Sequence, residues 1–304
     1  MRVLITGGSG FIGSHIAEHF QGKAEVRVLD SLRSGYRRNL DGLKVEFIEG
    51  DIRNRELVRE AMRGVDYVFH LAALVSVPES MEKITECIDI NAAGMIVVLE
   101  EAARAHVKKL CFSTSAAVYG DNPELPKRET MTPEPKSPYA ITKLDGEYYC
   151  RMFTDTGKLQ TACLRYFNVF GPRQDPKGAY AAAVPIFIDK AQRNEPLTIF
   201  GDGNQTRDFI FVKDIVAANV FLAQSPHTGV YNVANGGKIT IEDLAKEIIR
   251  LTGSKSEVVH LPERPGDIRH STASPEKLRS IGFTPSWKFA DGLAATIGGR
   301  SNPR

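Results

Sequence analysis

Short apolar runs alternate with longer stretches of mixed character along the first half of the chain. The apolar runs predict strands at residues 2–6, 25–29, 44–49, 66–70, 109–112 and 160–164. The stretches between them predict helices near residues 14–20, 54–62 and 82–105, and a further helix opens at Tyr139. Strands that alternate with helices form a parallel sheet covered by helices on both faces, so we expect a doubly wound α/β fold.

The second half of the chain is less regular. Residues 172–185 are loop-like, a helix follows to Arg193, and residues 197–200 predict another strand. Because 304 residues exceed what one small core needs, we expect two domains. The first spans residues 1–168, with a strand and a helix near 208–235 returning to it. The second is a smaller α/β domain that takes up most of residues 169–304.

Composition adds mainly exclusions. Hydrophobic residues make up 42% and charged residues 25% of the chain, as in an ordinary globular protein, and the formal net charge is +2. The basic runs are short, so we expect no nucleic-acid partner. The chain begins with a strand rather than a leader and has no apolar run of membrane-spanning length, so we expect a cytoplasmic protein without membrane contact.

The four cysteines point the same way. Cys87, Cys111, Cys150 and Cys163 form no C-x-x-C pair and no spacing typical of metal ligands. Cys111 and Cys163 lie in apolar runs, where buried and inert thiols are expected. We therefore expect a reducing compartment and no metal site.

A glycine string joins the first strand to the first helix. Gly7, Gly10 and Gly13 allow a tight turn, close approach of a pyrophosphate and close packing of helix on strand. The N–H groups at the start of the helix would face the phosphates. A carboxylate about 20 residues further on, Asp30, is placed to bind the adenosine ribose and to repel a 2′-phosphate. Arg33 is the alternative signal, because an arginine here could hold that phosphate; we interpret it as a loop cation and expect NAD.

Polar or small residues also follow the next strands. Asp51 is placed to accept from an adenine amine or, alternatively, to cap the helix near residue 54. Leu71, Ala72 and Ala73 would let a cofactor lie close to the fourth strand. Ser113 and Ser115 end the fifth strand, and we expect all these positions to meet in one crevice.

Tyr139 and Lys143 are one helical turn apart. A lysine ammonium favours the phenolate of a nearby tyrosine, which could then take a proton from a hydroxyl group. The spacing alone is more typical of a solvated surface pair. The catalytic interpretation becomes the better one because this helix follows the strand that ends in Ser113 and Ser115, beside the predicted dinucleotide site.

Longer strings in both halves carry a family resemblance. They are TGGSGFIG at 6–13, HLAA at 70–73, STSAAVYG at 113–120, YxxxK at 139–143, RYFNVFG at 165–171, GDGNQTRDF at 201–209 and RPGD at 264–267. Through them nearly the whole chain resembles the extended short-chain dehydrogenase/reductase family, and within it the nucleotide-sugar 4-epimerases of the UDP-glucose and UDP-N-acetylglucosamine type. The resemblance implies a Rossmann-type domain followed by a substrate-binding domain, and a homodimer formed through the helices near 91–105 and 139–153.

One departure from sister families is informative. Related 4,6-dehydratases carry an Asp-Glu pair just before Val-Tyr-Gly, and related decarboxylases keep the Glu. Here Ala116 and Ala117 occupy those positions, and neither can transfer a proton. We therefore expect epimerisation through transient oxidation at C4 of a UDP-hexose; the alternative is another NAD-dependent dehydrogenase or reductase of nucleotide sugars.

The resemblance also implies roles for individual residues. The catalytic set is Ser115, Tyr139 and Lys143. The residues implied to bind NAD are Gly7, Gly10, Phe11, Ile12, Asp30, Gly35, Asp51, Ile52, Leu71, Ala72, Ala73, Ser113, Tyr139, Lys143, Tyr166 and Val169. Those implied to bind the UDP-sugar are Ser115, Tyr139, Asn168, Gln174, Ala183, Val184, Thr198, Phe200, Arg207, Arg264, Asp267 and Ser271.

Ser271 bears on the choice of sugar. In the epimerase pattern a Tyr at this position leaves room only for a hydroxyl at C2 of the hexose. Ser271 is small and would leave space for a 2-acetamido group unless a neighbouring loop fills it. The pattern therefore favours acceptance of UDP-N-acetylhexosamines as well as UDP-hexoses.

Overall fold

The computed structural model describes residues 1–176, 182–263 and 269–299. Its main feature is a seven-stranded sheet in the order β11-β6-β5-β4-β1-β2-β3, in which every pairing is parallel. The strands are β1 Arg2–Thr6, β2 Glu25–Asp30, β3 Glu46–Glu49, β4 Tyr67–His70, β5 Lys109–Ser115, β6 Thr161–Tyr166 and β11 Gly229–Val233. The expected doubly wound α/β fold is confirmed.

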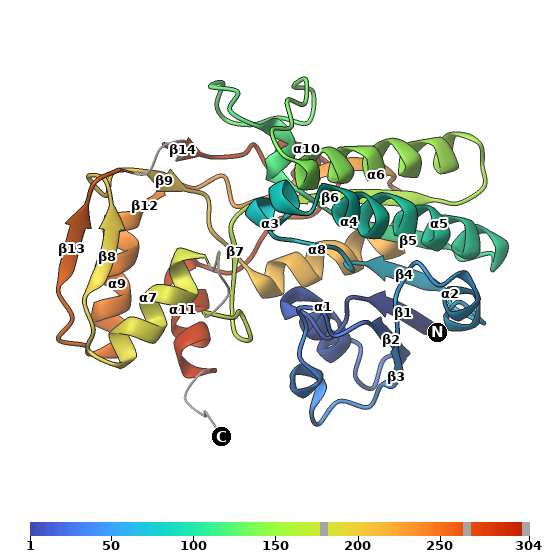
Figure 1. Ribbon diagram of the computed structural model, residues 1–304, viewed down its shortest axis with the longest axis horizontal. Coiled ribbons are helices and arrows are strands. Elements are labelled where there is room, and N and C mark those ends of the chain that lie inside the picture. The colour runs from blue at the N-terminus through green and yellow to red at the C-terminus, as the bar shows by residue number, and fades with distance from the viewer. Residues whose placement is uncertain (177–181, 264–268, 300–304) are drawn as a thin grey trace.

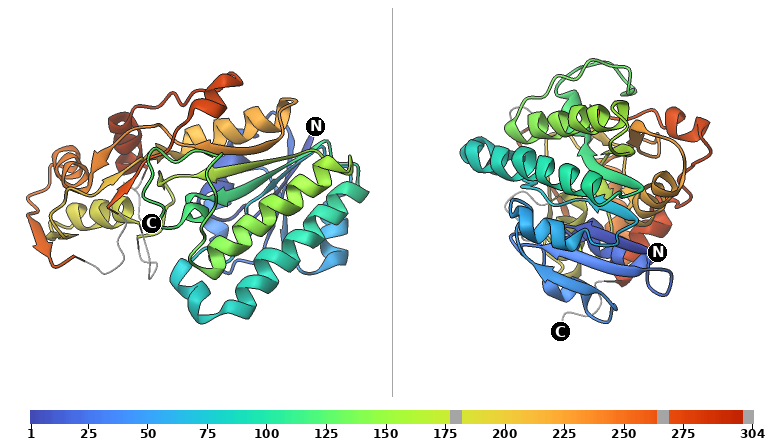
Figure 2. Two further views of the ribbon diagram at one scale, coloured as in Figure 1. Left: turned by 90° about the horizontal axis from the view of Figure 1, so that it is seen from above. Right: turned by 90° about the vertical axis from the view of Figure 1, so that its right-hand side faces the viewer.

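Alternate residues of β1 show how both faces of the sheet are buried. Val3 and Ile5 pack into a core shared with α1 (Phe11–His19) and α8 (Val212–Gln224). Leu4, between them, packs into a second core on the opposite face. That face is covered by α2 (Arg55–Ala61), α5 (Gly94–Arg104) and α6 (Pro138–Asp155), as Figures 1 and 2 show.

The expected helical stretch near residues 82–105 is confirmed from Ile84 to Arg104, with an irregular turn inside it and a break at Lys83 before it. The segment folds as α3 (Val77–Glu82), α4 (Ile84–Ile88), a π-helical turn at Asp89–Ala93 and then α5. The Ser76 side chain accepts from the Glu79 N–H and starts the helical segment early, and Lys83 (φ −121°) interrupts it. In the π turn, buried Asn91 bonds the backbone of Leu74 at both N–H (2.7 Å) and C=O (3.0 Å), a tertiary contact that sequence spacing does not reveal.

A smaller part of the molecule has its own apolar core. It contains α7 (Ala183–Gln192), α9 (Ile241–Thr252), α11 (Phe289–Gly298) and β8 (Leu197–Phe200), which pairs with β13 (Val258–Leu261). Figure 1 shows this part beside the edge of the large sheet that carries the site described below.

Short elements connect the two parts. They are β7 (Val169–Phe170) paired with β10 (Ile210–Phe211), and a three-stranded sheet of β12 (Ile239–Thr240), β9 (Thr206–Arg207) and β14 (His270–Ser271). The remaining helices are α10 (Glu276–Ser280) and the 3₁₀ turns η1 (Arg37–Leu40) and η3 (Ala116–Tyr119). The chain therefore crosses between the parts several times, and α8 and β11 return it to the large sheet.

The described residues lack both a membrane-spanning helix and a cluster of metal ligands. No helix in the described ranges has both the length and the apolar character needed to cross a membrane. Within the same ranges, no group of three or more His, Cys, Asp or Glu side chains is arranged to hold a metal ion.

Candidate active site

The carboxyl ends of the central strands border a cavity of about 810 Å³. All residues implied to bind NAD line it except Lys143, which is buried: Gly7, Gly10, Phe11, Ile12, Asp30, Gly35, Asp51, Ile52, Leu71, Ala72, Ala73, Ser113, Tyr139, Tyr166 and Val169. Of the residues implied to bind substrate, Ser115, Tyr139 and Gln174 line the same cavity. The structure thus brings together predicted positions that are up to 167 residues apart in the sequence (7 to 174).

The glycine string forms a cradle with no room for side chains at two positions. Gly7 has φ +72°, and a Cβ there would lie 2.7 Å from the Ala72 nitrogen. A Cβ on Gly13 would lie 2.3 Å from the Gly7 carbonyl oxygen. Gly10 precedes α1, and it has no side chain to cap the N–H groups at the start of that helix. Residues 10–13, which contain these groups, line the cavity, so the turn fits a pyrophosphate.

Asp30 is held in place by the backbone. The Ser9 N–H donates to its Oδ2 and the Leu32 N–H to its Oδ1, each at 2.8 Å. Burial raises the pKa of Asp30, and these two bonds act in the opposite direction. The carboxylate is therefore a fixed acceptor at one end of the cavity, suited to a pair of ribose hydroxyls.

Asp51 does not cap the next helix. The cap of α2 is Asn54, whose side chain accepts from the Leu57 N–H (3.2 Å). The Asp51 carboxylate instead binds the Arg53 guanidinium at 3.0 and 2.6 Å, and this contact lowers the pKa of Asp51. The capping alternative is therefore wrong, while Asp51 remains at the cavity wall.

Ser115 and Tyr139 meet at the inner end of the cavity. Ser115 ends β5, and its Oγ accepts from the Ala117 N–H (3.1 Å). Tyr139 lies in the first turn of α6, which starts at Pro138 and is capped by the Ser137 side chain through the Ala140 N–H (3.2 Å). The Ser115 side chain lies near enough to the Tyr139 phenol to lower the pKa of that phenol.

Lys143 lies one turn further along α6 and is buried. Its Nζ donates to the Ser113 carbonyl oxygen (2.8 Å) and lies 5.7 Å from the centroid of the Tyr139 ring. Burial lowers the pKa of Lys143 to about 8. Burial also raises the pKa of Tyr139, against the effect of Ser115. Lys143 is not among the groups that shift this pKa, so the expectation that Lys143 favours the phenolate stays a prediction.

The other residues implied to bind substrate, as far as the structure describes them, do not line this cavity. Asn168 (φ +26°) donates from Nδ2 to the Asp208 carbonyl oxygen (3.2 Å). Arg207 and Ser271 are register partners on β9 and β14. Thr198 accepts from Lys190 Nζ (3.2 Å). Phe200 ends β8 and Ala183 begins α7. Val184, the next residue, is 1% exposed and lies in the core of the smaller part. Arg264 and Asp267 lie outside the described residues.

A buried carboxyl group supports the strand that carries Ser271. Asp208 accepts from the N–H groups of Asn235 (3.1 Å), Gly236 (3.0 Å) and Ala273 (3.3 Å). Burial raises the pKa of Asp208 to about 6, and these bonds act in the opposite direction. Asp208 therefore ties β14 to the loop after β11 and fixes the position of Ser271 relative to Arg207.

Several residues that line the cavity were not predicted to bind a ligand. They include Ser31, Arg33, Ser34, Tyr36, Gly50, Arg53, Val75, Glu86, Ile90, Thr114 and Asp175. Ser34 and Tyr36 belong to the loop that follows Asp30, so their nearness to Asp30 in the sequence could have predicted that they line the cavity. Asp175 has no such signal: the Tyr36 hydroxyl donates to its Oδ2 (2.6 Å) across 139 residues of sequence.

Comparison with known proteins places this geometry in a family. The model of the NAD-dependent epimerase/dehydratase family matches residues 3–234. A putative UDP-glucose 4-epimerase of Methanocaldococcus jannaschii is 35% identical, with 99% of this chain and 98% of the relative covered.

Two solved structures are also similar over nearly their full length. The UDP-N-acetylglucosamine 4-epimerase of Methanobrevibacter ruminantium M1, in complex with UDP-N-acetylmuramic acid, has a TM-score of 0.94 and 40% identity, with 98% of this chain and 97% of that chain covered. The UDP-glucose 4-epimerase of Thermus thermophilus, in complex with NAD, has a TM-score of 0.89 and 38% identity, with 98% of each chain covered.

Proposed function

The chain belongs to the NAD-dependent epimerase/dehydratase family, and we propose that it is a UDP-hexose 4-epimerase with NAD as its prosthetic group. The substrates proposed are the pairs UDP-glucose/UDP-galactose and UDP-N-acetylglucosamine/UDP-N-acetylgalactosamine. The observation that carries the proposal is that Ser115 and Tyr139 line a cavity whose glycine cradle fits a dinucleotide, with the Lys143 ammonium buried beside the Tyr139 ring.

The chemistry assigned to the residues follows from their positions. Bound NAD would accept the C4 hydride of the hexose and return it to the opposite face. Tyr139 takes the proton from the C4 hydroxyl, and Ser115, which lies near the phenol, would hold the same oxygen and help that proton move. Lys143 is anchored by the Ser113 carbonyl oxygen and would hold the ribose on the nicotinamide side of the cofactor.

The family includes dehydratases, so membership does not fix the reaction. Ala116 and Ala117 follow Ser115 directly and open the turn η3. They supply no acid or base beside the sugar, where dehydration and decarboxylation need one. Epimerisation needs no further proton transfer beyond the one assigned to Tyr139, and this supports it over the other two reactions.

Binding of the nucleotide sugar is proposed to involve both parts of the molecule. We propose a cofactor domain of residues 1–168, with residues near 208–235 returning to it, and a substrate domain that takes up most of residues 169–304. Asn168, Arg207 and Arg264 would hold the diphosphate, since guanidinium groups suit phosphate oxygens. Ser271, small and fixed beside Arg207, supports acceptance of a 2-acetamido group.

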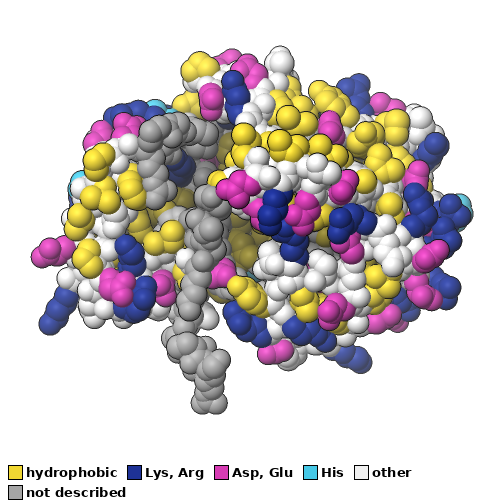
Figure 3. Space-filling view, in the orientation of Figure 1, with side chains coloured by type: hydrophobic (Ala, Val, Ile, Leu, Met, Phe, Trp, Pro, Cys, Tyr) yellow, Lys and Arg dark blue, Asp and Glu magenta, His cyan; other side chains and the backbone are white. Residues whose placement is uncertain are grey.

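We also propose a homodimer and a cytoplasmic location. Large apolar side chains are exposed along α4 and α6: Ile84, Ile88, Ile141, Tyr148 and Met152. Figure 3 shows hydrophobic side chains gathered over this helical face, at the upper right. A second copy would cover it. The four cysteines are free and buried, as suits a reducing compartment.

The test is incubation of the purified protein with UDP-glucose and, separately, with UDP-N-acetylglucosamine, without added cofactor. We expect the C4 epimer from both, separated by chromatography. Ser271→Tyr should keep the first conversion and lose the second. If neither substrate yields its C4 epimer, and NADH accumulates once NAD is supplied, the protein is a dehydrogenase instead.

A further inference from the structure

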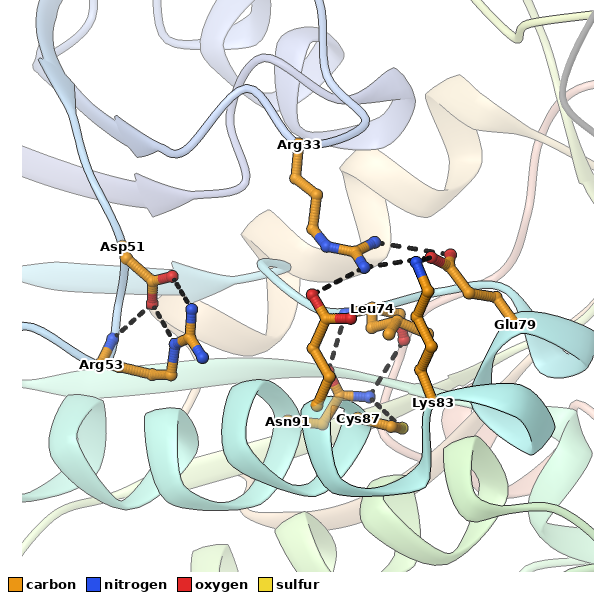
Figure 4. A network of polar contacts seen from close by, with 9 residues as sticks. Arg33, Asp51, Arg53, Leu74, Glu79, Lys83, Cys87 and Asn91 are labelled. Atoms are coloured by element: carbon orange, nitrogen blue, oxygen red, sulfur yellow. Dashed lines mark hydrogen bonds and ion pairs between the residues drawn. The ribbon is translucent and has the colours of Figure 1, made fainter.

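Two arginines line the adenosine end of the cavity, the end marked by Asp30 and Asp51. They are Arg33, on the loop after β2, and Arg53, on the loop after β3. Among the described residues lining the cavity they are the cationic side chains, so a phosphate entering here would be expected to meet one of them. Figure 4 shows that both already bind carboxylates.

Arg33 reaches across the mouth of the cavity to two helices. Its guanidinium binds Glu79 of α3 in a bidentate contact (Nη2 to Oε1 3.0 Å, Nη1 to Oε2 3.4 Å) and Glu86 of α4 (Nη2 to Oε1 2.9 Å). Lys83 binds the same Oε1 of Glu79 at 3.0 Å and so holds that carboxylate in place. Arg53 is held in the same way by Asp51.

The orientation of these contacts has a chemical consequence. A guanidinium that recognises a phosphate uses the same planar pair of N–H donors that Glu79 and Glu86 now occupy. A 2′-phosphate would therefore have to displace two carboxylates and then lie near them and Asp30. A ribose with a free 2′-hydroxyl requires neither.

We propose that Glu79 and Glu86 contribute to the choice of cofactor by binding Arg33. While both carboxylates occupy its guanidinium, Arg33 cannot bind the 2′-phosphate of NADP. The discrimination then depends on two residues of α3 and α4, remote in sequence from β2, in addition to Asp30 itself. The inference rests on the NAD-dependent function proposed above, and it concerns binding, so it can be tested without the sugar reaction.

The test uses the full-length protein, freed of bound nucleotide with charcoal, and measures dissociation constants for NAD and NADP by calorimetry. In Glu79→Gln/Glu86→Gln, we expect NADP to bind about tenfold or more tightly relative to wild type, as one freed charge-assisted contact allows. NAD affinity should change less than about threefold. These pairs are partly exposed and contribute little to folding, so the variant should remain folded.

Two further proteins make the result decisive. Glu56→Gln/Glu82→Gln removes the same charge from positions that do not line the cavity, and it should leave both constants unchanged. Adding Arg33→Ala to the Glu79/Glu86 variant should return NADP affinity to the wild-type value. The proposal is overturned if NADP affinity does not rise, if the control variant raises it equally, or if Arg33→Ala leaves the gain intact. A protein that binds NAD but epimerises nothing would overturn only the proposed function.

Discussion

The buried pair Glu147–Arg165 offers the sharpest test of how the site is held. Glu147 lies one turn after Lys143 on α6, and its carboxylate binds Arg165 of β6 at 2.9 and 2.6 Å. It also accepts from the Thr114 hydroxyl of β5 (2.8 Å). Both charged side chains are only 4% exposed, so the pair joins α6 to the two strands next to the catalytic residues.

Glu147→Leu should destabilise the protein strongly. Removing one partner of a buried pair leaves an uncompensated charge and typically costs about 3–5 kcal/mol. With an unfolding entropy of about 2.1 cal/mol/K per residue, a chain of this length should lose roughly 5–8 °C in Tm. Differential scanning calorimetry measures this directly, and turnover should fall as well, because α6 carries Tyr139 and Lys143.

Two comparisons separate this explanation from general damage to α6. Glu147→Leu/Arg165→Met removes both charges and should recover most of the lost stability, because a well-packed apolar pair often replaces a buried ion pair without loss. Asp155→Asn breaks the exposed Arg151–Asp155 pair on the same helix and should cost at most about 1 kcal/mol. The reasoning would be refuted if Glu147→Leu/Arg165→Met were as unstable as Glu147→Leu. It would also be refuted if the free energy of unfolding of Glu147→Leu lay within about 1 kcal/mol of the wild-type value.

Three other predictions concern the cavity itself. Tyr139→Phe should lower epimerase turnover by about 10²–10⁴ while leaving NAD binding near its wild-type level; a loss of less than about tenfold would contradict its role as base. Lys143→Met should raise the Tm of nucleotide-free protein at pH 7, because the wild type buries an ammonium whose pKa is lowered to about 8. Since the unfolded chain binds more protons than the folded one between pH 8 and the usual lysine value, the gain should shrink as pH rises through that window, and a constant gain would count against it. Gly13→Ala should lower both stability and NAD affinity, because its Cβ would meet the Gly7 carbonyl oxygen, whereas Gly237→Ala, with open space around it, should do neither.

Local patterns predicted much of the fold and of the cavity. The glycine string, the acidic end of β2 and the Tyr139–Lys143 spacing each depend on a few neighbouring residues whose geometry is set by one turn or one helix. The parallel sheet follows from the alternation of strands and helices. These are features that a single sequence carries within short windows.

What could not be predicted depends on contacts between distant segments. The π turn at Asp89–Ala93 contains Asn91, whose bonds to the distant backbone of Leu74 no periodicity reveals. The partners of Arg33 lie 46 and 53 residues away, and that of Tyr36 lies 139 residues away. The direction of the Tyr139 pKa shift could not be predicted for a related reason: the spacing reveals a neighbouring ammonium but not the burial that raises the pKa of the phenol.

The arrangement of α6 on β5 explains why position and ionisation are controlled separately in this site. Tyr139, Lys143 and Glu147 are spaced one turn apart, and they contact Ser115, the Ser113 carbonyl and Thr114, which are consecutive residues at the end of one strand. Packing therefore fixes the geometry of the phenol and the ammonium before any ligand binds. Burial, however, raises the pKa of Tyr139 and lowers that of Lys143, so it favours the neutral form of each group. A positive charge brought into the cavity beside Tyr139, such as that of an oxidised nicotinamide ring, would lower the pKa of the phenol. Tyr139 should therefore become an effective base when the dinucleotide site is filled.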